Sequence, residues 1–152
     1  MKRIAILMVL AMLFTACTSI KINNANGFDA NTVQQVCIVH NSKVTINNFD
    51  KIVENSFKRY GIDAKTYQAN DNFLNICQTV LHYTALRSWD MATYMVFAEF
   101  KLFRNGQQVS TSSFKLRGKG GLALNKWRST EVKINELVDQ LLKKPSSTQT
   151  KN

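Results

Sequence analysis

The sequence lacks an apolar run that could cross a bilayer as a helix, and its amino terminus comes closest to one. Lys2 and Arg3 precede an uncharged apolar stretch over residues 4–14, whereas a membrane-spanning helix needs about 20 such residues. Two small residues follow, and the chain then becomes polar. This order is typical of a secretory leader that is cleaved, so we expect residues 1–16 to be a signal peptide.

The end of this leader, Leu13-Phe14-Thr15-Ala16-Cys17, resembles a bacterial lipoprotein signal, with phenylalanine where leucine is commonest. The resemblance implies cleavage before Cys17 and a lipid anchor on that cysteine. The two residues after it lack the acidic side chain associated with inner-membrane retention, so we expect a protein anchored to the periplasmic face of the outer membrane. A plain signal peptide with a chance cysteine is the alternative.

Motifs of catalysis and nucleotide binding are also missing. The chain has no P-loop, no Gly-x-Ser-x-Gly elbow and no Cys-x-x-Cys pair. Its two histidines, His40 and His82, fall on separate predicted strands without a carboxylate near in sequence, which favours half-buried histidines over a metal site. We expect a protein that is not an enzyme and uses no cofactor or metal. The alternative is a periplasmic enzyme whose site forms only by tertiary folding.

Acidic residues are half as numerous as basic ones, 10 against 20. Loss of Lys2 and Arg3 with the leader would leave 18 basic residues and a net charge of +8. In an exported protein this charge favours anionic head groups, an anionic cell-wall component or an acidic protein, and not nucleic acid. A solvated basic surface is an equally good explanation, because net charge alone specifies no site.

Three cysteines are present, and a lipid on Cys17 would leave Cys37 and Cys77. We expect these two to form a disulfide in an oxidising compartment. Closing a loop of that length stabilises a domain by roughly 3–4 kcal/mol in the chain-entropy model. Two free, buried thiols are the alternative.

The remaining pattern predicts one domain. Residues 17–31 are polar and asparagine-rich without a period, so we expect a flexible tether behind the lipidated Cys17. Residues 32–143 carry the periodic segments of a single α+β domain. Residues 144–152 are polar and include Pro145, so we expect them to form a disordered tail.

Within that domain, residues 33–39 are rich in β-branched side chains and predict a buried strand. Residues 49–60 have helical spacing, with Gly61 as a left-handed stop. Residues 62–68 return as a parallel strand. Strands are also expected over residues 79–87, 93–104 and 107–117, and Ser129 or Thr130 caps a final helix. These segments predict a two-layer α+β sandwich, with a mixed sheet of about five strands and two helices on one face.

The hairpin at Asn105-Gly106 sets which side chains share a face. A three-residue turn with Gly106 left-handed groups Ala98 and Phe114 on the core face and leaves an unusually apolar opposite face. We expect this helix-free face to bind a partner, although the tether or the segment around Trp127 could cover it instead. The predicted partner-binding residues are Met95, Phe97, Lys101, Phe103 and Lys115, aided by Lys119 in the glycine-rich loop.

The corner between the preceding two strands holds Trp89 and Asp90. We expect Trp89 to close the core there and Asp90 to cap backbone amides.

Several segments together resemble a small, uncharacterised family of Gram-negative envelope lipoproteins. They are Cys17, residues 36–39, Cys77, residues 87–95, Asn105-Gly106-Gln107, Arg117-Gly118 with Gly120-Gly121, and residues 136–141. The order of elements also resembles the amino-terminal domain of TolB and the lipoprotein activators of penicillin-binding proteins. This second resemblance is one of architecture and implies no function. Our own expectation is a noncatalytic module that binds an envelope protein or an anionic cell-wall component, and a homodimer could also cover the apolar face.

Overall fold

The structure, a computed structural model, describes residues 18–25, 27–72, 75–116 and 124–143. The predicted signal peptide over residues 1–16, the anchor at Cys17, Lys119 and the tail over residues 144–152 lie outside these described residues.

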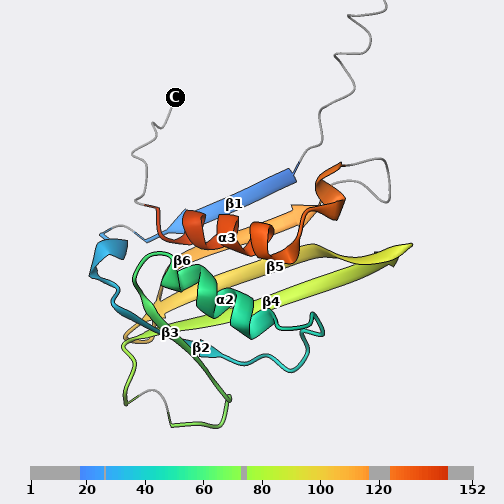
Figure 1. Ribbon diagram of the computed structural model, residues 1–152. Helices are drawn as coiled ribbons and strands as arrows, with labels where there is room; N and C mark the ends of the chain where they lie inside the picture. Colours follow the sequence, from blue (N-terminus) through green and yellow to red (C-terminus); the bar gives the residue numbers. More distant parts are fainter. Residues whose placement is uncertain (1–17, 26, 73–74, 117–123, 144–152) are drawn as a thin grey trace, which may run out of the picture.

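Six strands form one mixed sheet in the order β1-β6-β5-β4-β2-β3 (Figure 1). The short β2 pairs parallel with both β3 and β4, and the remaining neighbours are antiparallel. The strands are β1 Thr18–Asn24, β2 Gln35–Val39, β3 Asp63–Tyr67, β4 Thr79–Asp90, β5 Ala92–Arg104 and β6 Gln107–Leu116.

Two helices, α2 Phe49–Lys58 and α3 Thr130–Leu141, lie side by side on one face of this sheet (Figure 1). Gly61 follows α2 with φ +71°, the left-handed stop that the sequence predicts. The Ser129 hydroxyl accepts a 3.2 Å hydrogen bond from the Val132 amide and caps α3. Two short 3₁₀ helices, η1 Ala30–Thr32 and η2 Leu124–Trp127, complete the fold. The predicted α+β class with two helices on one face is confirmed.

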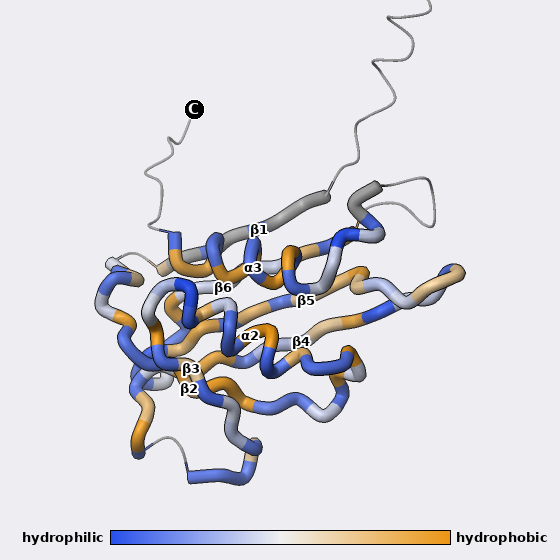
Figure 2. Tube along the Cα trace, viewed as in Figure 1, coloured by the Kyte–Doolittle hydropathy of each residue, from blue (hydrophilic) through white to orange (hydrophobic). Residues whose placement is uncertain are grey.

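The core fills the space between the helices and the sheet. Figure 2 shows apolar and polar colours alternating along α3, and its apolar residues Ile134, Leu137, Val138 and Leu141 are buried. The β2–α2–β3 unit is parallel, as predicted, and places Val53 and Phe57 of α2 against the sheet at full burial. The largest fully buried sheet side chains in this core are Ile38, Leu81, Met95, Phe100, Leu102 and Phe114.

The prediction of a flexible tether over residues 17–31 is wrong for most of that segment. Residues 18–24 form β1, which pairs with β6 from Thr18 opposite Leu116 to Asn24 opposite Ser110. An edge strand offers unpaired backbone groups, and pairing with it requires no apolar period, so a polar stretch can join the sheet. With β1 the sheet has six strands, one more than the five or so expected. Phe28, from the same predicted tether, is also buried in the core.

The turn between β5 and β6 has two residues and not the three predicted. Arg104 pairs with Gln107, and Asn105 and Gly106 both have positive φ, 51° and 77°, which is the type I′ arrangement of hairpins. Two pairs away from the turn the register shifts, between Leu102 and Phe103 on β5, because Val109 is an extra residue on β6. Because the shift has the same net effect, Ala98 still lies opposite Phe114 as expected.

The predicted disulfide between Cys37 and Cys77 is present, with the two Cα atoms 6.0 Å apart. It joins β2 to the segment before β4. Both cysteines pack with Val39 and Val80 in a second, smaller apolar cluster. This cluster lies on the other side of the sheet from the main core, since the neighbours Val36 and Ile38 belong to that core.

A carboxylate fastens α2 to the edge strand β3. Glu54 Oε1 accepts hydrogen bonds from the Thr66 amide at 3.0 Å and the Thr66 hydroxyl at 2.9 Å, and Glu54 Oε2 lies 3.3 Å from Lys51 Nζ. Partial burial opposes ionisation of Glu54, but the bonds from Thr66 and Lys51 outweigh it and hold the pKa of this carboxyl below its usual range.

We predict that Glu54→Gln lowers the free energy of unfolding at neutral pH by about 1–2 kcal/mol, because hydrogen bonds to a charged acceptor are worth more than those to an amide. The folded-state pKa is the lower one, so the stabilisation is complete above the unfolded-state pKa and is lost as the pH falls through the folded-state value. Urea unfolding at neutral and acidic pH should show the two proteins converging on acidification.

Glu131→Gln is the control, since Glu131 is exposed in the first turn of α3 and should cost about 0.5 kcal/mol or less. An equal loss in both variants at neutral pH would contradict the role of Glu54.

Candidate functional site

The two α-helices of the described residues, α2 and α3, cover the same side of the sheet, and the other side of the described sheet carries a surface that we call the helix-free face. Its central row is set by β5, where Phe97 lies between Leu86 and Lys115 on the neighbouring strands. Alternation along each strand places the rest of the set on this side. The face consists of His82, Thr84, Leu86, Phe97, Glu99, Lys101, Phe103, Thr111, Ser113 and Lys115.

The helix-free face combines apolar and basic groups that solvent reaches. Leu86 is 58% exposed, while Phe97 and Phe103 are half-buried. Lys101 Nζ lies 3.0 Å from Glu99 Oε2, and Lys115 is exposed. The structure thus brings together four predicted partner-binding residues: Phe97, Lys101, Phe103 and Lys115.

Met95, the fifth of these within the described residues, belongs to the core instead, and its prediction as a binding residue is wrong. Leu86 pairs with Phe97 but Arg87 pairs with Met95, so Val96 is an extra residue on β5 and forms a β-bulge. A bulge inverts the alternation of side chains beyond it. Met95 is consequently 2% exposed and packs under the helices.

His82 belongs to the helix-free face and packs against a neighbouring aromatic residue of that face. Its ring meets the Phe103 ring edge-on, with centroids 5.4 Å apart. Desolvation lowers the pKa of His82, which favours the neutral imidazole. The charge of this face therefore comes from its lysines and Glu99.

His40 has a carboxylate partner that lies ten residues away in sequence. Its Nδ1 is 2.7 Å from Asp50 Oδ2, and the buried Tyr83 hydroxyl donates to the other oxygen of Asp50. The same hydroxyl accepts from the Asn41 amide at 3.1 Å. Burial, together with the bond to Asp50, raises the pKa of Tyr83. The network ties the first turn of α2 to β4.

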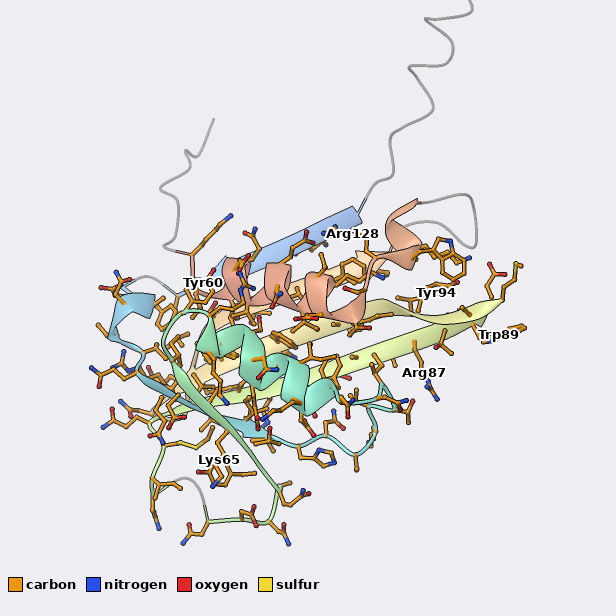
Figure 3. The ribbon with its side chains drawn as sticks, viewed as in Figure 1. Tyr60, Lys65, Arg87, Trp89, Tyr94 and Arg128 are labelled. Carbon is orange, nitrogen blue, oxygen red and sulfur yellow. A yellow bond between two sulfur atoms is a disulfide. The ribbon has the colours of Figure 1, made fainter. Side chains whose placement is uncertain are left out.

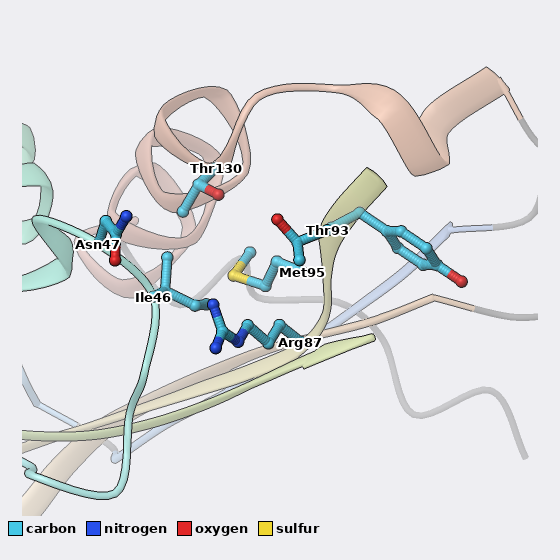
Figure 4. A pocket seen from close by; sticks show the side chains of 7 residues that line it. Ile46, Asn47, Arg87, Thr93, Met95 and Thr130 are labelled. Carbon is cyan, nitrogen blue, oxygen red and sulfur yellow. The ribbon is translucent and has the colours of Figure 1, made fainter. Parts of the chain in front are cut away.

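A groove opens between the helix layer and the base of the β4–β5 hairpin (Figure 4). It encloses about 220 Å³ and is lined by Arg87, Thr93, Tyr94 and Met95 from the hairpin and by Ile46, Asn47 and Thr130 from the opposite side. Among these lining residues Arg87 is the one with a full charge. The groove could receive an acidic group of a partner, and Arg87 and Tyr94 are the two titratable side chains among its lining residues.

The hairpin tip, defined as residues 88–92, is the most exposed apolar feature among the described residues. Trp89 is 72% exposed and Met91 is 88% exposed, and Trp89 points away from the body of the molecule in Figure 3. Trp89 therefore does not close the core as expected. Asp90, expected to cap backbone amides, forms an ion pair with Lys126 instead.

A stack of side chains braces this hairpin. Lys126 is almost fully buried, with Nζ 4.6 Å from the Tyr94 ring centroid and 4.9 Å from that of Trp127. The buried Lys133 Nζ donates to the carbonyl oxygens of Met95 at 3.2 Å and Lys126 at 3.0 Å. Sequence patterns gave no sign of these contacts, since they join residues far apart in the chain.

Within the described ranges, no group of three or more histidine, cysteine or acidic side chains is placed to hold a metal ion. No helix among the same residues has the length and apolar character that a bilayer crossing needs.

The described residues form a small α+β domain with one sheet face that α2 and α3 leave uncovered. No family model matches the sequence, and no curated protein matches it. Among solved structures the fold is similar to PelC from Paraburkholderia phytofirmans, which was solved as a dodecamer. A leucine-to-methionine variant of PelC gives a TM-score of 0.54 at 14% identity, over 84% of this chain and 100% of that chain.

A second PelC structure, in another space group, gives a TM-score of 0.51 at 14% identity and covers 82% of this chain and 96% of that one. Similarity at this level of identity extends to the fold alone.

We predict that Tyr83→Phe lowers the free energy of unfolding by about 1–3 kcal/mol, because it leaves the Asn41 amide and Asp50 short of a buried partner. Tyr60→Phe is the matched control. The Tyr60 hydroxyl also donates to an aspartate, Asp139, at 2.7 Å, but Tyr60 is 47% exposed and its loss should cost about 0.5 kcal/mol or less. Denaturant unfolding of both variants distinguishes the cases, and equal costs would show that the network has no structural role.

Proposed function

We propose that this protein is an envelope lipoprotein, anchored through Cys17 to the periplasmic face of the outer membrane, which acts without catalysis by binding a second molecule. The leader over residues 1–16 and the resemblance to Gram-negative envelope lipoproteins support the address. The Cys37–Cys77 disulfide supports it further, because such bonds persist in oxidising compartments.

The helix-free face is the observation that carries the binding function. A sheet face that is not covered by helices is ordinarily polar, yet this one presents Leu86, Phe97 and Phe103 between lysines. Apolar centres with a charged rim are characteristic of interaction surfaces.

An envelope protein or an anionic cell-wall component fits this chemistry, and so does a second copy of the chain. The dodecameric state of PelC gives self-association some support, through the shared fold only.

A periplasmic enzyme is the second candidate, and the His40–Asp50 pair is the observation that favours it, because a carboxylate that orients an imidazole is a common acid–base arrangement. The structural use of Asp50 by Tyr83 favours the binding function instead.

We predict that the mature chain begins at Cys17 with a diacylated thiol and an acylated amino group. Two or more acyl chains hold a protein stably on a membrane, whereas one chain binds marginally. Mass spectrometry of the amino-terminal peptide from the native host measures this directly. An unmodified cysteine, or a mature chain that begins elsewhere, would exclude the anchor.

We also predict that Phe97→Ser combined with Lys101→Glu weakens partner binding or self-association by about 1–3 kcal/mol, the range of interface anchors. Cross-linking of the intact anchored protein in cells measures the effect. The matched control is Val132→Ser with Lys43→Glu, which changes an exposed apolar and an exposed basic residue away from the face. Unchanged cross-links in a folded Phe97/Lys101 variant would rule out this surface.

A further inference from the structure

The amino end of β1 and the tip of the β4–β5 hairpin lie at the same end of the sheet. Thr18, the first residue of β1, pairs with Leu116, next to the pairing of Lys115 with Phe97. The β4–β5 hairpin continues past this level (Figure 1), and Met91 joins Asp90 at the end of β4 to Ala92 at the start of β5. At about 3.3 Å per residue, the five steps along the chain from Val96 to Met91 carry the tip about 16 Å beyond the start of β1.

The tip presents large apolar side chains where a solvent-exposed turn ordinarily has small polar ones. Trp89 and Met91 are 72% and 88% exposed, and Met91 adopts a left-handed backbone with φ +62°. That conformation suits glycine or asparagine and is uncommon for a long side chain. A methionine at this position places a flexible apolar group at the furthest point of the hairpin.

The charge at the tip is compatible with a lipid head-group region. Asp90, the acidic residue within the tip, is neutralised by Lys126. Arg87, which is exposed, stands two residues behind Trp89. Lys126 itself packs against the rings of Tyr94 and Trp127, so the residues behind the tip are held by side-chain contacts. An indole with a cationic neighbour is the arrangement that proteins place at membrane interfaces.

We propose that Trp89 and Met91 insert into the surface of the membrane that carries the anchor, so that the domain docks on the lipid at two points. This inference rests on the proposed function, because the anchor at Cys17 brings the lipid to this end of the sheet. One peptide unit of about 3.8 Å separates Cys17 from the start of β1. With so little slack, anchoring holds the amino end of β1 near the head groups and the hairpin tip within reach of them.

The test uses Trp89 as its own reporter. The chain has two tryptophans, so Trp127→Phe leaves Trp89 alone while keeping an aromatic ring against Lys126. With Cys37 and Cys77 bonded, Cys17 is the remaining thiol of the chain over residues 17–152. It can be coupled to a maleimide lipid in vesicles of phosphatidylethanolamine and phosphatidylglycerol that contain lipids brominated on the upper acyl carbons.

Trp89 should lose about half of its emission or more on brominated vesicles, because an interfacial depth of about 5–10 Å brings the indole beside the bromines. The matched control carries Trp89→Phe, Trp127→Phe and Ile76→Trp. Ile76 is 57% exposed and precedes β4 at the opposite end of the sheet. A tryptophan there should keep its emission.

Equal emission on brominated and unbrominated vesicles for Trp89, or equal quenching at both positions, would overturn the proposal. A blue-shifted Trp89 in vesicle-free protein, together with a larger molecular mass, would assign the tip to a second copy and would also overturn it. Chemical coupling makes the result independent of native lipidation. An unmodified Cys17 in cells would therefore refute the anchor without deciding the insertion of the tip, which the quenching decides separately.

Discussion

The alternation of side chains along β5 is the constraint on which both the core under the helices and the helix-free face depend. The strand pairs with β4 on one side and β6 on the other, so each of its residues is committed to one face of the sheet. Ala98, Phe100 and Leu102 enter the core, and the residues between them form the helix-free face. The bulge at Val96 ends this arrangement. Beyond it Met95 turns under the helices, and the hairpin continues with an inverted pattern.

Features with a strong local or periodic cause were predictable from the sequence. The helical spacing before Gly61, the parallel return of β3 and the pairing of Cys37 with Cys77 all appear as expected. The wrong predictions have a different cause. Residues 18–24 join the sheet through backbone bonds that leave no hydrophobic period, and the bulge at Val96 lies in a run that is apolar on both sides, so no change of pattern marks it.

The sequence could not predict how the β4–β5 hairpin is held, because the contacts that hold it join residues far apart in the chain. Lys126 meets Asp90 across 36 residues, and Lys133 meets Met95 across 38. Lys133 is fully buried, and desolvation lowers the pKa of its amino group, helped by the nearby Arg128. A charged group in that position requires acceptors, and it finds them in the carbonyl oxygens of Met95 and Lys126. The hairpin base, η2 and α3 are thereby fixed together.

The packed base of the hairpin links the proposed membrane contact to the proposed binding face. The disulfide and the hairpin tip lie toward opposite ends of the sheet. A domain held at the tip and at the start of β1 would therefore stand with its strand axes pointing away from the lipid. The helix-free face would then be perpendicular to the membrane plane and would point toward molecules beside the domain on the same membrane. A partner that lies on the same membrane, whether an envelope protein or another copy of the chain, can reach such a face directly. Because both molecules would be confined to one surface, a weak contact between them would gain from a raised effective concentration. The apolar patch of Leu86, Phe97 and Phe103 would then need less affinity of its own for the association that we propose.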